Sequence, residues 1–186
     1  VKVVSPDIAH KTEAGGVRLN VQTLDDLKAA AREVQAAACT AYPAARIEGV
    51  VIQEMAQGVE VIVGAVNDPQ FGPVVVFGLG GIFSELMQDV TRRLAPFECD
   101  TARGMISELR GSALFSGFRG GAALDVEALA DVLSRVSLLA ADHAESIGEI
   151  DINPLIVRAA GKGVVAADAL IVLRRRQGDK VGSRSS

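Results

Sequence analysis

The sequence contains few aromatic residues and few cysteines, and each shortage excludes a class of protein. Aromatic residues make up 4% of the 186 positions and tryptophan is absent, so the core must be aliphatic. The two cysteines, Cys39 and Cys99, lack the spacing of a metal site, which favours a reduced, intracellular protein. We find no run of 18 apolar residues and no signal peptide, so we expect a cytoplasmic protein that does not span a membrane.

Basic charge is also in short supply. The formal net charge is −4, which argues against a general nucleic-acid-binding protein. Basic residues gather only in the final stretch, 174–186, for which we expect a solvated, disordered tail, with an anion-binding arm as the alternative. The chain does have 49% apolar residues, 23% charged residues and 19 glycines. This composition predicts a globular protein with many tight turns, large enough for one domain or two small lobes.

The order of the predicted strands and helices indicates an α+β protein. Strands are predicted at 1–4, 16–21, 46–55, 56–66, 73–81, 147–157 and 164–173, with short strands within 82–97. Helices are predicted at 24–42, 101–109 and 126–146, with Thr23 and Asp125 as N-caps. This order is neither a regular βαβ alternation nor all-β, so we expect two lobes whose sheets are covered by helices. We place the lobes at 1–56 and 57–173, followed by the tail 174–186.

The opening stretch "VKVVSPDIAHKTEAGGV" combines a lysine with a glycine pair. Lys2 on a buried strand is costly unless its ammonium reaches water or an anion. Backbone N–H groups at Gly15 and Gly16 can approach a ligand closely. A lysine followed by a glycine loop is typical of phosphate binding, although the P-loop motif is absent. A lysine at a strand edge and a simple β-turn are the structural alternative.

The two histidines lie in different settings. His10 falls in the predicted loop, beside Lys11 and before the glycine pair. An imidazole there can act as a base, a ligand or a nucleophile, and a purely structural role is the alternative. His143 falls late in a predicted amphipathic helix, where we expect a surface residue near the helix C-terminus.

The stretch "EIDINPL" carries polar side chains within a predicted strand. Asp151 and Asn153 lie two residues apart, so both point to one face of the strand. The returning strand can place Asp168 opposite them. Three oxygen-bearing side chains on one face suit Mg²⁺. Pro154 is expected to end the regular pairing, and the alternative is a set of solvent-facing polar residues on an edge strand.

A glycine cluster follows the predicted strand at 73–81. Gly78, Gly80 and Gly81 precede Glu85, but they do not form the dinucleotide-binding motif GxGxxG. The cluster predicts either a loop that meets a ligand or a bulge or tight turn between strands.

Four stretches together resemble one known family. In chain order they are "KVVSPDIAHKTEAGGV", "QEMAQGVEVIVG", "FGPVVVFGLGGIFSELMQDVTRRLAP" and "EIDINPLIV". They resemble the ATP-grasp domain of the ADP- or NDP-forming acyl-CoA synthetases, a family related to the β subunit of succinyl-CoA synthetase. The resemblance covers residues 1–173 and implies an ATP-grasp fold with ATP or ADP and Mg²⁺ as cofactors.

The resemblance also implies roles for residues at matching positions. Lys2 looks like the lysine that holds the nucleotide phosphates, and His10 like the loop histidine that takes the γ-phosphoryl group. Glu54 and Met55 fall at the hinge that grips the adenine. Glu60 is similar to an acidic residue near the ribose and the phosphates.

Further positions match the metal site and a docking site of that family. The implied Mg²⁺ ligands are Asn153 and Asp168, with Asp151 beside them. A swinging phosphohistidine would dock at Gly80, Gly81 and Glu85. In the family, a second histidine on the CoA-binding part passes the phosphoryl group to an acyl phosphate. Phosphoryl transfer depends mainly on positioning and charge neutralisation, which such residues supply.

The implied function is the nucleotide-binding part of an acyl-CoA synthetase that interconverts acyl-CoA, ADP and phosphate with a carboxylate, ATP and CoA. Members of the family have a further stretch before the Lys2 strand, and also CoA-binding and ligase domains. We therefore expect this chain to be one piece of a larger enzyme, inactive alone. Its partners would be those domains, in the same protein or in a partner subunit, and its substrates CoA and a carboxylic acid; an oligomer stays open.

Two other functions are considered. Similar domains are fused to acetyltransferase domains in protein-lysine acetyltransferases, where a regulatory role is implied, and the domain order of the parent gene distinguishes this case. A non-catalytic interface module is the other. Such a module would have lost nucleotide binding. The chain keeps four residues that the resemblance assigns to the nucleotide and metal site, which argues against such a loss: Lys2, His10, Asn153 and Asp168.

Overall fold

The computed structural model describes residues 1–8, 11–81, 89–117 and 120–174. It divides the chain into two compact units, which we call unit 1 (Val1–Met55) and unit 2 (Ala56–Ser186). Within the described ranges, no helix is both long enough and apolar enough to cross a membrane. Of the predicted tail, only Arg174 is described, and its N–H donates to the Ser146 carbonyl over 2.8 Å.

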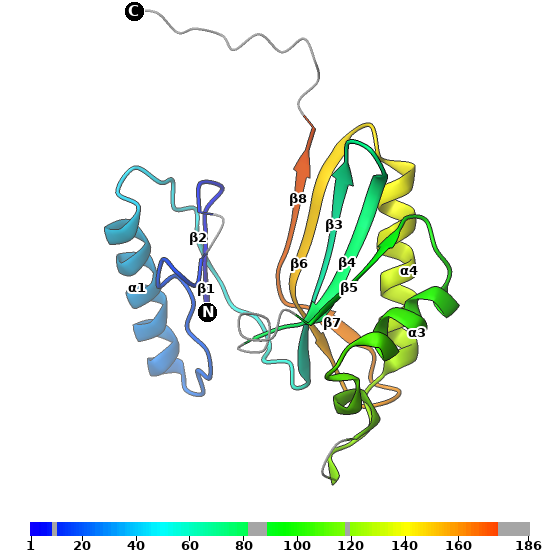
Figure 1. The fold of residues 1–186 in the computed structure, drawn as a ribbon. Coiled ribbons are helices and arrows are strands. Elements are labelled where there is room, and N and C mark those ends of the chain that lie inside the picture. Colours follow the sequence, from blue (N-terminus) through cyan, green and yellow to red (C-terminus); the bar gives the residue numbers. More distant parts are fainter. Residues whose placement is uncertain (9–10, 82–88, 118–119, 175–186) are drawn as a thin grey trace, which may run out of the picture. The chain divides into compact units, whose positions relative to one another are not determined.

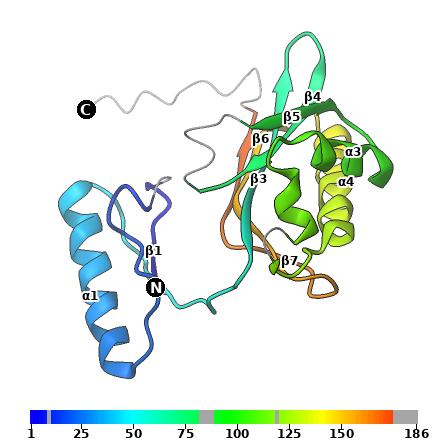
Figure 2. The same ribbon diagram turned by 60° about the horizontal axis from the view of Figure 1, so that its bottom comes forward.

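Unit 1 is a two-stranded antiparallel sheet and one helix, α1, which lies beside β1 (Figure 1 and Figure 2). Its elements are β1 (Lys2–Val4), α1 (Leu24–Ala41) and β2 (Gly49–Val51). Thr23 caps α1 as predicted, because its hydroxyl accepts the N–H of Asp26 over 3.1 Å. The small core joins β1 and the loop after it to the buried side of α1.

Two predicted strands of unit 1 differ from the structure. The predicted strand at 16–21 does not form, because Val17 makes only an isolated bridge to Lys2. The predicted strand at 46–55 is shortened to β2, since β1 is only three residues long and offers no further partner. The predicted helix is confirmed and ends at Ala41, before Pro43.

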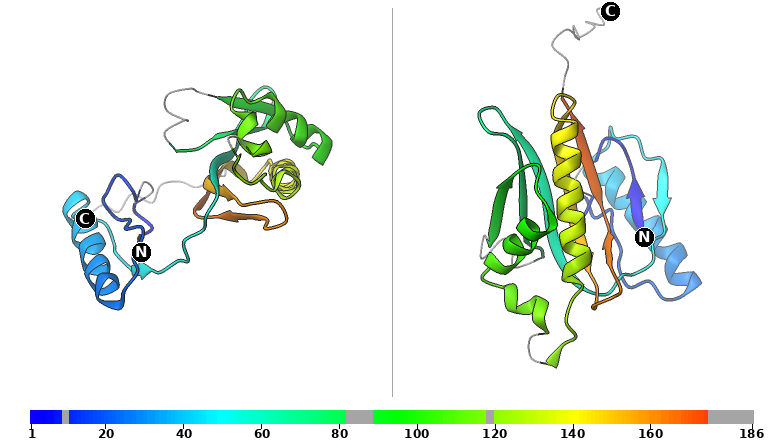
Figure 3. Two further views of the ribbon diagram at one scale, coloured as in Figure 1. Left: turned by 90° about the horizontal axis from the view of Figure 1, so that it is seen from below. Right: turned by 90° about the vertical axis from the view of Figure 1, so that its right-hand side faces the viewer.

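Unit 2 is an antiparallel sheet with the order β5-β4-β3-β6-β7, in which β8 also pairs with β6. Its strands are β3 (Val59–Asp68), β4 (Gly72–Leu79), β5 (Val90–Leu94), β6 (Ile147–Val157), β7 (Val164–Ala166) and β8 (Ala169–Leu173). Its helices are α3 (Cys99–Glu108), the 3₁₀ helix η1 (Ser112–Ser116) and α4 (Val126–Asp142). Both α3 and α4 lie against the same face of the sheet (Figure 1 and Figure 3).

The covered face of this sheet supplies most of the core. Val61, Val63 and Val75 are fully buried against residues of α3 and α4 such as Met105 and Leu129. The prediction of an aliphatic core therefore holds in the main. Phenylalanines contribute as well: Phe77, Phe97 and Phe115 are all buried in this core. Among the described residues of unit 2, no helix lies on the opposite face of the sheet, so it is the face on which functional side chains can be presented.

Unit 2 confirms most of its predicted elements. Strands at 56–66, 73–81 and 147–157 and the helices at 101–109 and 126–146 are present with small shifts of their ends. His143 is the exposed C-cap residue of α4, as predicted. The predicted strand at 164–173 is wrong as a single element. It forms two strands, β7 and β8, that pair with different halves of β6.

Asp125 fastens the start of α4 to the hairpin between β6 and β7. One carboxylate oxygen accepts the N–H of Ala128 over 3.2 Å and the other accepts the N–H of Gly163 over 2.7 Å. These hydrogen bonds, led by that from Gly163, hold the pKa of Asp125 below its ordinary value of 3.8. The predicted N-cap therefore has a second function, because it also ties the helix to the sheet.

Candidate functional site

Lys2 lies at the start of β1, next to the fully buried Val3. Because side chains alternate along a strand, Lys2 is directed away from the core of unit 1, and it is half-buried. Its backbone pairs with Val51 and bridges to Val17. A partly buried ammonium costs less when an anion accompanies it, so this position fits the phosphate-holding role that the resemblance implies.

The loop that carries the glycine pair closes on itself. Gly16 N–H donates to the Lys11 carbonyl over 2.8 Å, and Gly15 N–H donates to the Thr12 carbonyl over 3.0 Å. Gly15 has a φ of +66°, and a Cβ on Gly16 would lie 2.5 Å from Cγ1 of Val3. The turn and the packing therefore explain both glycines. The predicted donation of these two N–H groups to a phosphate has no support in this geometry.

Two predicted residues lie outside the described part of the chain. They are His10, the predicted phosphoryl acceptor, and Glu85, the third member of the predicted docking site. Their roles stay predictions.

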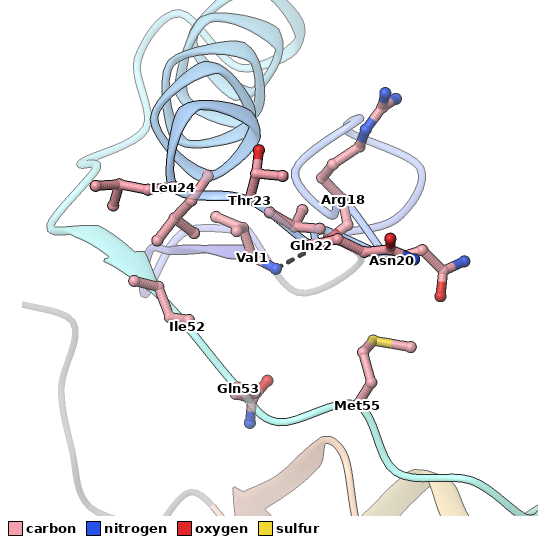
Figure 4. Close-up of a pocket in the computed structure, with 11 residues that line it drawn as sticks. Val1, Arg18, Asn20, Gln22, Thr23, Leu24, Ile52, Gln53 and Met55 are labelled. Carbon is pink, nitrogen blue, oxygen red and sulfur yellow. Dashed lines mark hydrogen bonds between the residues drawn. The ribbon is translucent and has the colours of Figure 1, made fainter.

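Met55 lines a pocket of unit 1 with a volume of about 350 Å³ (Figure 4). The pocket wall combines apolar side chains, among them Ile52 and Leu24, with polar ones such as Gln53. This volume and this mixed lining are typical of small-molecule sites. Met55 is part of this lining and Glu54 is not, and the adenine-gripping role of both stays a prediction.

Glu60 and the glycine cluster meet at one end of the sheet of unit 2. Glu60 is exposed, and it lies on the uncovered face because its neighbour Val61 is buried. Gly80 N–H donates to the Glu60 carbonyl over 2.8 Å, and a Cβ on Gly80 would lie only 3.0 Å from the Glu60 carbonyl carbon. Gly81, with a φ of +64°, follows directly. The structure thus brings a predicted nucleotide-binding residue next to two predicted docking residues.

A β-bulge in β6 shapes the predicted metal site. Val61 pairs with Leu155 but Val63 pairs with Ile152, so β6 contains one extra residue opposite β3. As a result, Ile150 faces the core before the bulge and Leu155 faces it afterwards. Asp151, which precedes the bulge, lies on the uncovered face.

The bulge also brings Asp168 next to Asn153. Asp168 lies in the break between β7 and β8, and its carbonyl accepts the Asn153 N–H over 3.3 Å. Pro154 does not end the pairing, which corrects the prediction. Its carbonyl accepts the N–H of Ala167 over 3.0 Å, and β6 continues to Val157 with β7 as its new partner.

The donor set at this bulge fits Mg²⁺ in its chemistry. Asp151, Asn153 and Asp168 offer only oxygen-bearing acceptors and amide groups, as a hard cation requires. Among the described residues, no group of three or more His, Cys, Asp or Glu side chains could hold a metal by itself. A metal here would therefore keep water and phosphate oxygens as its remaining ligands, which is the usual state of nucleotide-bound Mg²⁺.

Asp89 is a buried carboxylate that the sequence analysis missed. Its two oxygens accept the N–H groups of Arg110 and Gly111, over 3.0 and 2.9 Å. These partners lie more than 20 positions away along the chain, so no short sequence pattern predicts the contact. The only available signal was an acidic residue directly before a predicted strand.

A model of the family described as "ATP-grasp domain" matches residues 1–173. The chain belongs to the ATP-grasp domain family. This membership confirms the predicted fold class, a mixed α+β ATP-grasp fold.

Relatives of this chain differ in length. The β subunit of ADP-forming acetate–CoA ligase II of Pyrococcus furiosus is 42% identical over 175 residues, covering 94% of this chain and 74% of that subunit. ADP-forming acetate–CoA ligase I of Archaeoglobus fulgidus is 45% identical over 166 residues, covering 89% of this chain but 24% of that protein. The chain thus spans about a quarter of the longer relative and about three quarters of the separate subunit.

Solved structures of a third protein carry the same ATP-grasp fold. Acetyl-coenzyme A synthetase 1 of Ca. Korarchaeum cryptofilum, in complex with coenzyme A and Ca-AMPCP, matches with a TM-score of 0.86 and 43% identity over 93% of this chain and 75% of that one. Its complex with coenzyme A and Mg-AMPPCP, with the phosphohistidine segment pointing towards the nucleotide binding site, gives a TM-score of 0.75 and 38% identity over 94% and 75%.

Proposed function

We propose that this chain is the nucleotide-binding part of an ADP-forming acyl-CoA synthetase, which interconverts acyl-CoA, ADP and phosphate with a carboxylate, ATP and CoA. The observation that carries the proposal is the 42% identity to the Pyrococcus furiosus β subunit, which extends over 74% of that subunit. The partners are the CoA-binding and ligase domains, in the same protein or in a second subunit. The substrates are CoA and a carboxylic acid.

The residues of unit 1 bind the nucleotide in this proposal. The pocket at Met55 takes the adenine, and the ammonium of Lys2 neutralises phosphate charge. His10 attacks the γ-phosphorus through an imidazole nitrogen, the bond from phosphorus to the bridging oxygen of ADP breaks, and ADP leaves. The histidine then holds the phosphoryl group reversibly, which divides one difficult transfer into two easier ones.

The residues of unit 2 hold the metal and receive the partner in this proposal. Asn153 and Asp168, with Asp151 beside them, are the metal ligands. Bound Mg²⁺ supplies charge neutralisation to the phosphate oxygens. Gly80, Gly81 and Glu85 form the docking site for the histidine-bearing segment of the CoA-binding part. Support comes from the oxygen donors at the bulge in β6 and from the nucleotide–metal complexes of the Korarchaeum enzyme.

The phosphohistidine step is tested on the full-length protein together with its CoA-binding part. Incubation with γ-labelled ATP should leave a label that acid removes and base does not. In the His10→Ala variant we expect this label to disappear and ligase turnover to fall about 10³-fold or more, because the nucleophile is lost.

The matched control is His143→Ala, which removes the other histidine of the chain, an exposed C-cap residue. This variant should keep both label and turnover. Intact labelling and turnover in His10→Ala would contradict the assigned role of His10. A wild-type protein that makes no ATP from acyl-CoA, ADP and phosphate would contradict the proposed function itself.

A further inference from the structure

The turn at Gly80 and Gly81 is packed tightly on the side of β3. A Cβ on Gly80 would lie 3.0 Å from the carbonyl carbon and 3.1 Å from the carbonyl oxygen of Glu60. Backbone atoms cannot move aside as the end of a flexible side chain can. Glycine therefore allows the turn to lie close to β3, and the hydrogen bond from Gly80 N–H to the Glu60 carbonyl, 2.8 Å long, holds it there.

A second contact fixes the same turn from the helical side of unit 2. Leu79, the last residue of β4, is buried and lies against Gly111. A Cβ on Gly111 would lie 2.4 Å from Cδ1 of Leu79, so glycine at this position lets the Leu79 side chain pack directly against this backbone. The position of Gly111 thus affects how the buried Leu79 side chain packs, directly before Gly80.

Asp89 holds Gly111 in that position. Asp89 is 8% exposed, and its carboxylate uses one oxygen for the N–H of Arg110 and the other for the N–H of Gly111, over 3.0 and 2.9 Å. Charge-assisted hydrogen bonds of this kind are stronger than neutral ones. Losing either hydrogen bond would leave the buried carboxylate poorly compensated. The carboxylate therefore holds both backbone N–H groups in place.

We propose that Asp89 is a positioning residue for phosphoryl transfer, which sets the Gly80–Gly81 turn through Gly111 and Leu79. The proposal rests on the proposed function, in which this turn receives the phosphohistidine of the CoA-binding part. Asp89 itself does not touch the reacting atoms. It acts by keeping the backbone of the turn where the incoming phosphoryl group needs it, and misplacement by about 1 Å at such sites costs about 10²-fold in rate.

The test is the Asp89→Asn variant of the full-length protein with its CoA-binding part. Asparagine keeps the shape but replaces one accepting oxygen by an NH₂ group, which faces a backbone N–H and cannot accept it. We expect kcat of the ligase reaction to fall about 10-fold to 10²-fold, while KM for ADP and the rate of ATP–ADP exchange stay within about 2-fold of wild type. Exchange needs only the transfer to His10, so it does not use the docking turn.

Asp125→Asn is the matched control, because Asp125 also gives one oxygen to each of two backbone N–H groups. Both variants should lower the unfolding temperature, but only Asp89→Asn should lower kcat. An equal loss of kcat in both variants, unchanged kcat in Asp89→Asn, or a parallel loss of exchange and ligase activity would overturn the positioning role. If the wild-type protein has no ligase activity, the proposed function is wrong, and the positioning role of Asp89, which depends on it, is wrong as well.

Discussion

At the scale of single residues, the candidate metal site depends on one extra residue in β6. Without the bulge between Ile152 and Leu155, the alternation of β6 would continue and the side chains after it would change faces. The bulge lets Asp151 lie on the uncovered face while Leu155 returns to the core. It also allows the change of partner from β8 to β7, and Asp168 occupies the gap that this change leaves.

This arrangement predicts a specific effect of Asp168→Asn on the metal. The amide has one accepting oxygen and no charge, so it is a weaker ligand for a hard cation. We expect the Mg²⁺ concentration for half-maximal ligase activity to rise about 10-fold or more, with little change in the unfolding temperature. The measurement is a Mg²⁺ titration of ligase activity in the full-length protein.

Glu149→Gln supplies the comparison for that titration. Glu149 is an exposed carboxylate on the same strand and the same face as Asp151, and no predicted role falls on it. Its loss should leave the Mg²⁺ dependence unchanged. A similar shift in both variants would mean that general surface charge, rather than a ligand, is responsible.

At the scale of elements, Asp125 makes the attachment of α4 to the sheet dependent on pH. Its pKa is lowered in the folded state, chiefly by the Gly163 N–H, so the folded protein favours the charged carboxylate. Stability gained in this way is fully present above the ordinary value of 3.8 and is lost as pH falls through the lower, folded value.

The Asp125→Asn variant isolates this effect. Asparagine still caps a helix but does not titrate, and it leaves the Gly163 N–H without its charged acceptor. We expect the unfolding temperature to drop by about 2–4 °C at pH 7. The difference from wild type should stay constant down to about pH 5 and close below about pH 4. Thermal unfolding at a series of pH values measures it, and a difference that persists unchanged at pH 2–3 would contradict the argument.

Elements that are fixed by local pattern were predictable, whereas those that depend on a partner were not. Thr23 and Asp125 mark their helices by residue type alone. The break at Asp168 depends on the bulge in a neighbouring strand, and β2 is short because β1 is short. For the candidate site, the residue pairing expected in a β-hairpin was enough to predict that Asp168 lies opposite Asn153. The Asp89 clamp was not predictable, because its partners are contributed by the segment after α3.

At the scale of the whole molecule, the two units have cores of very different size. Among the described residues, unit 1 buries Val3, Ile8, Ala14 and Ala38 in its core cluster. The corresponding cluster of unit 2 contains large side chains from the sheet, α3 and α4. Since buried apolar area is the main source of stability, unit 1 should open more readily than unit 2.

Hydrogen exchange on the helices α1 and α4 tests this difference directly. The two helices have 18 and 17 residues, so their intrinsic length effects are matched. α1 buries Ala30, Val34 and Ala38, whereas α4 buries leucines such as Leu129 and Leu133. We expect the central amides of α1 to exchange at least about 10-fold faster than those of α4, because opening of unit 1 alone exposes them. Equal protection of the two helices would mean that the chain opens only as a single cooperative body, and the assignment of separate stabilities to the two units would then be wrong.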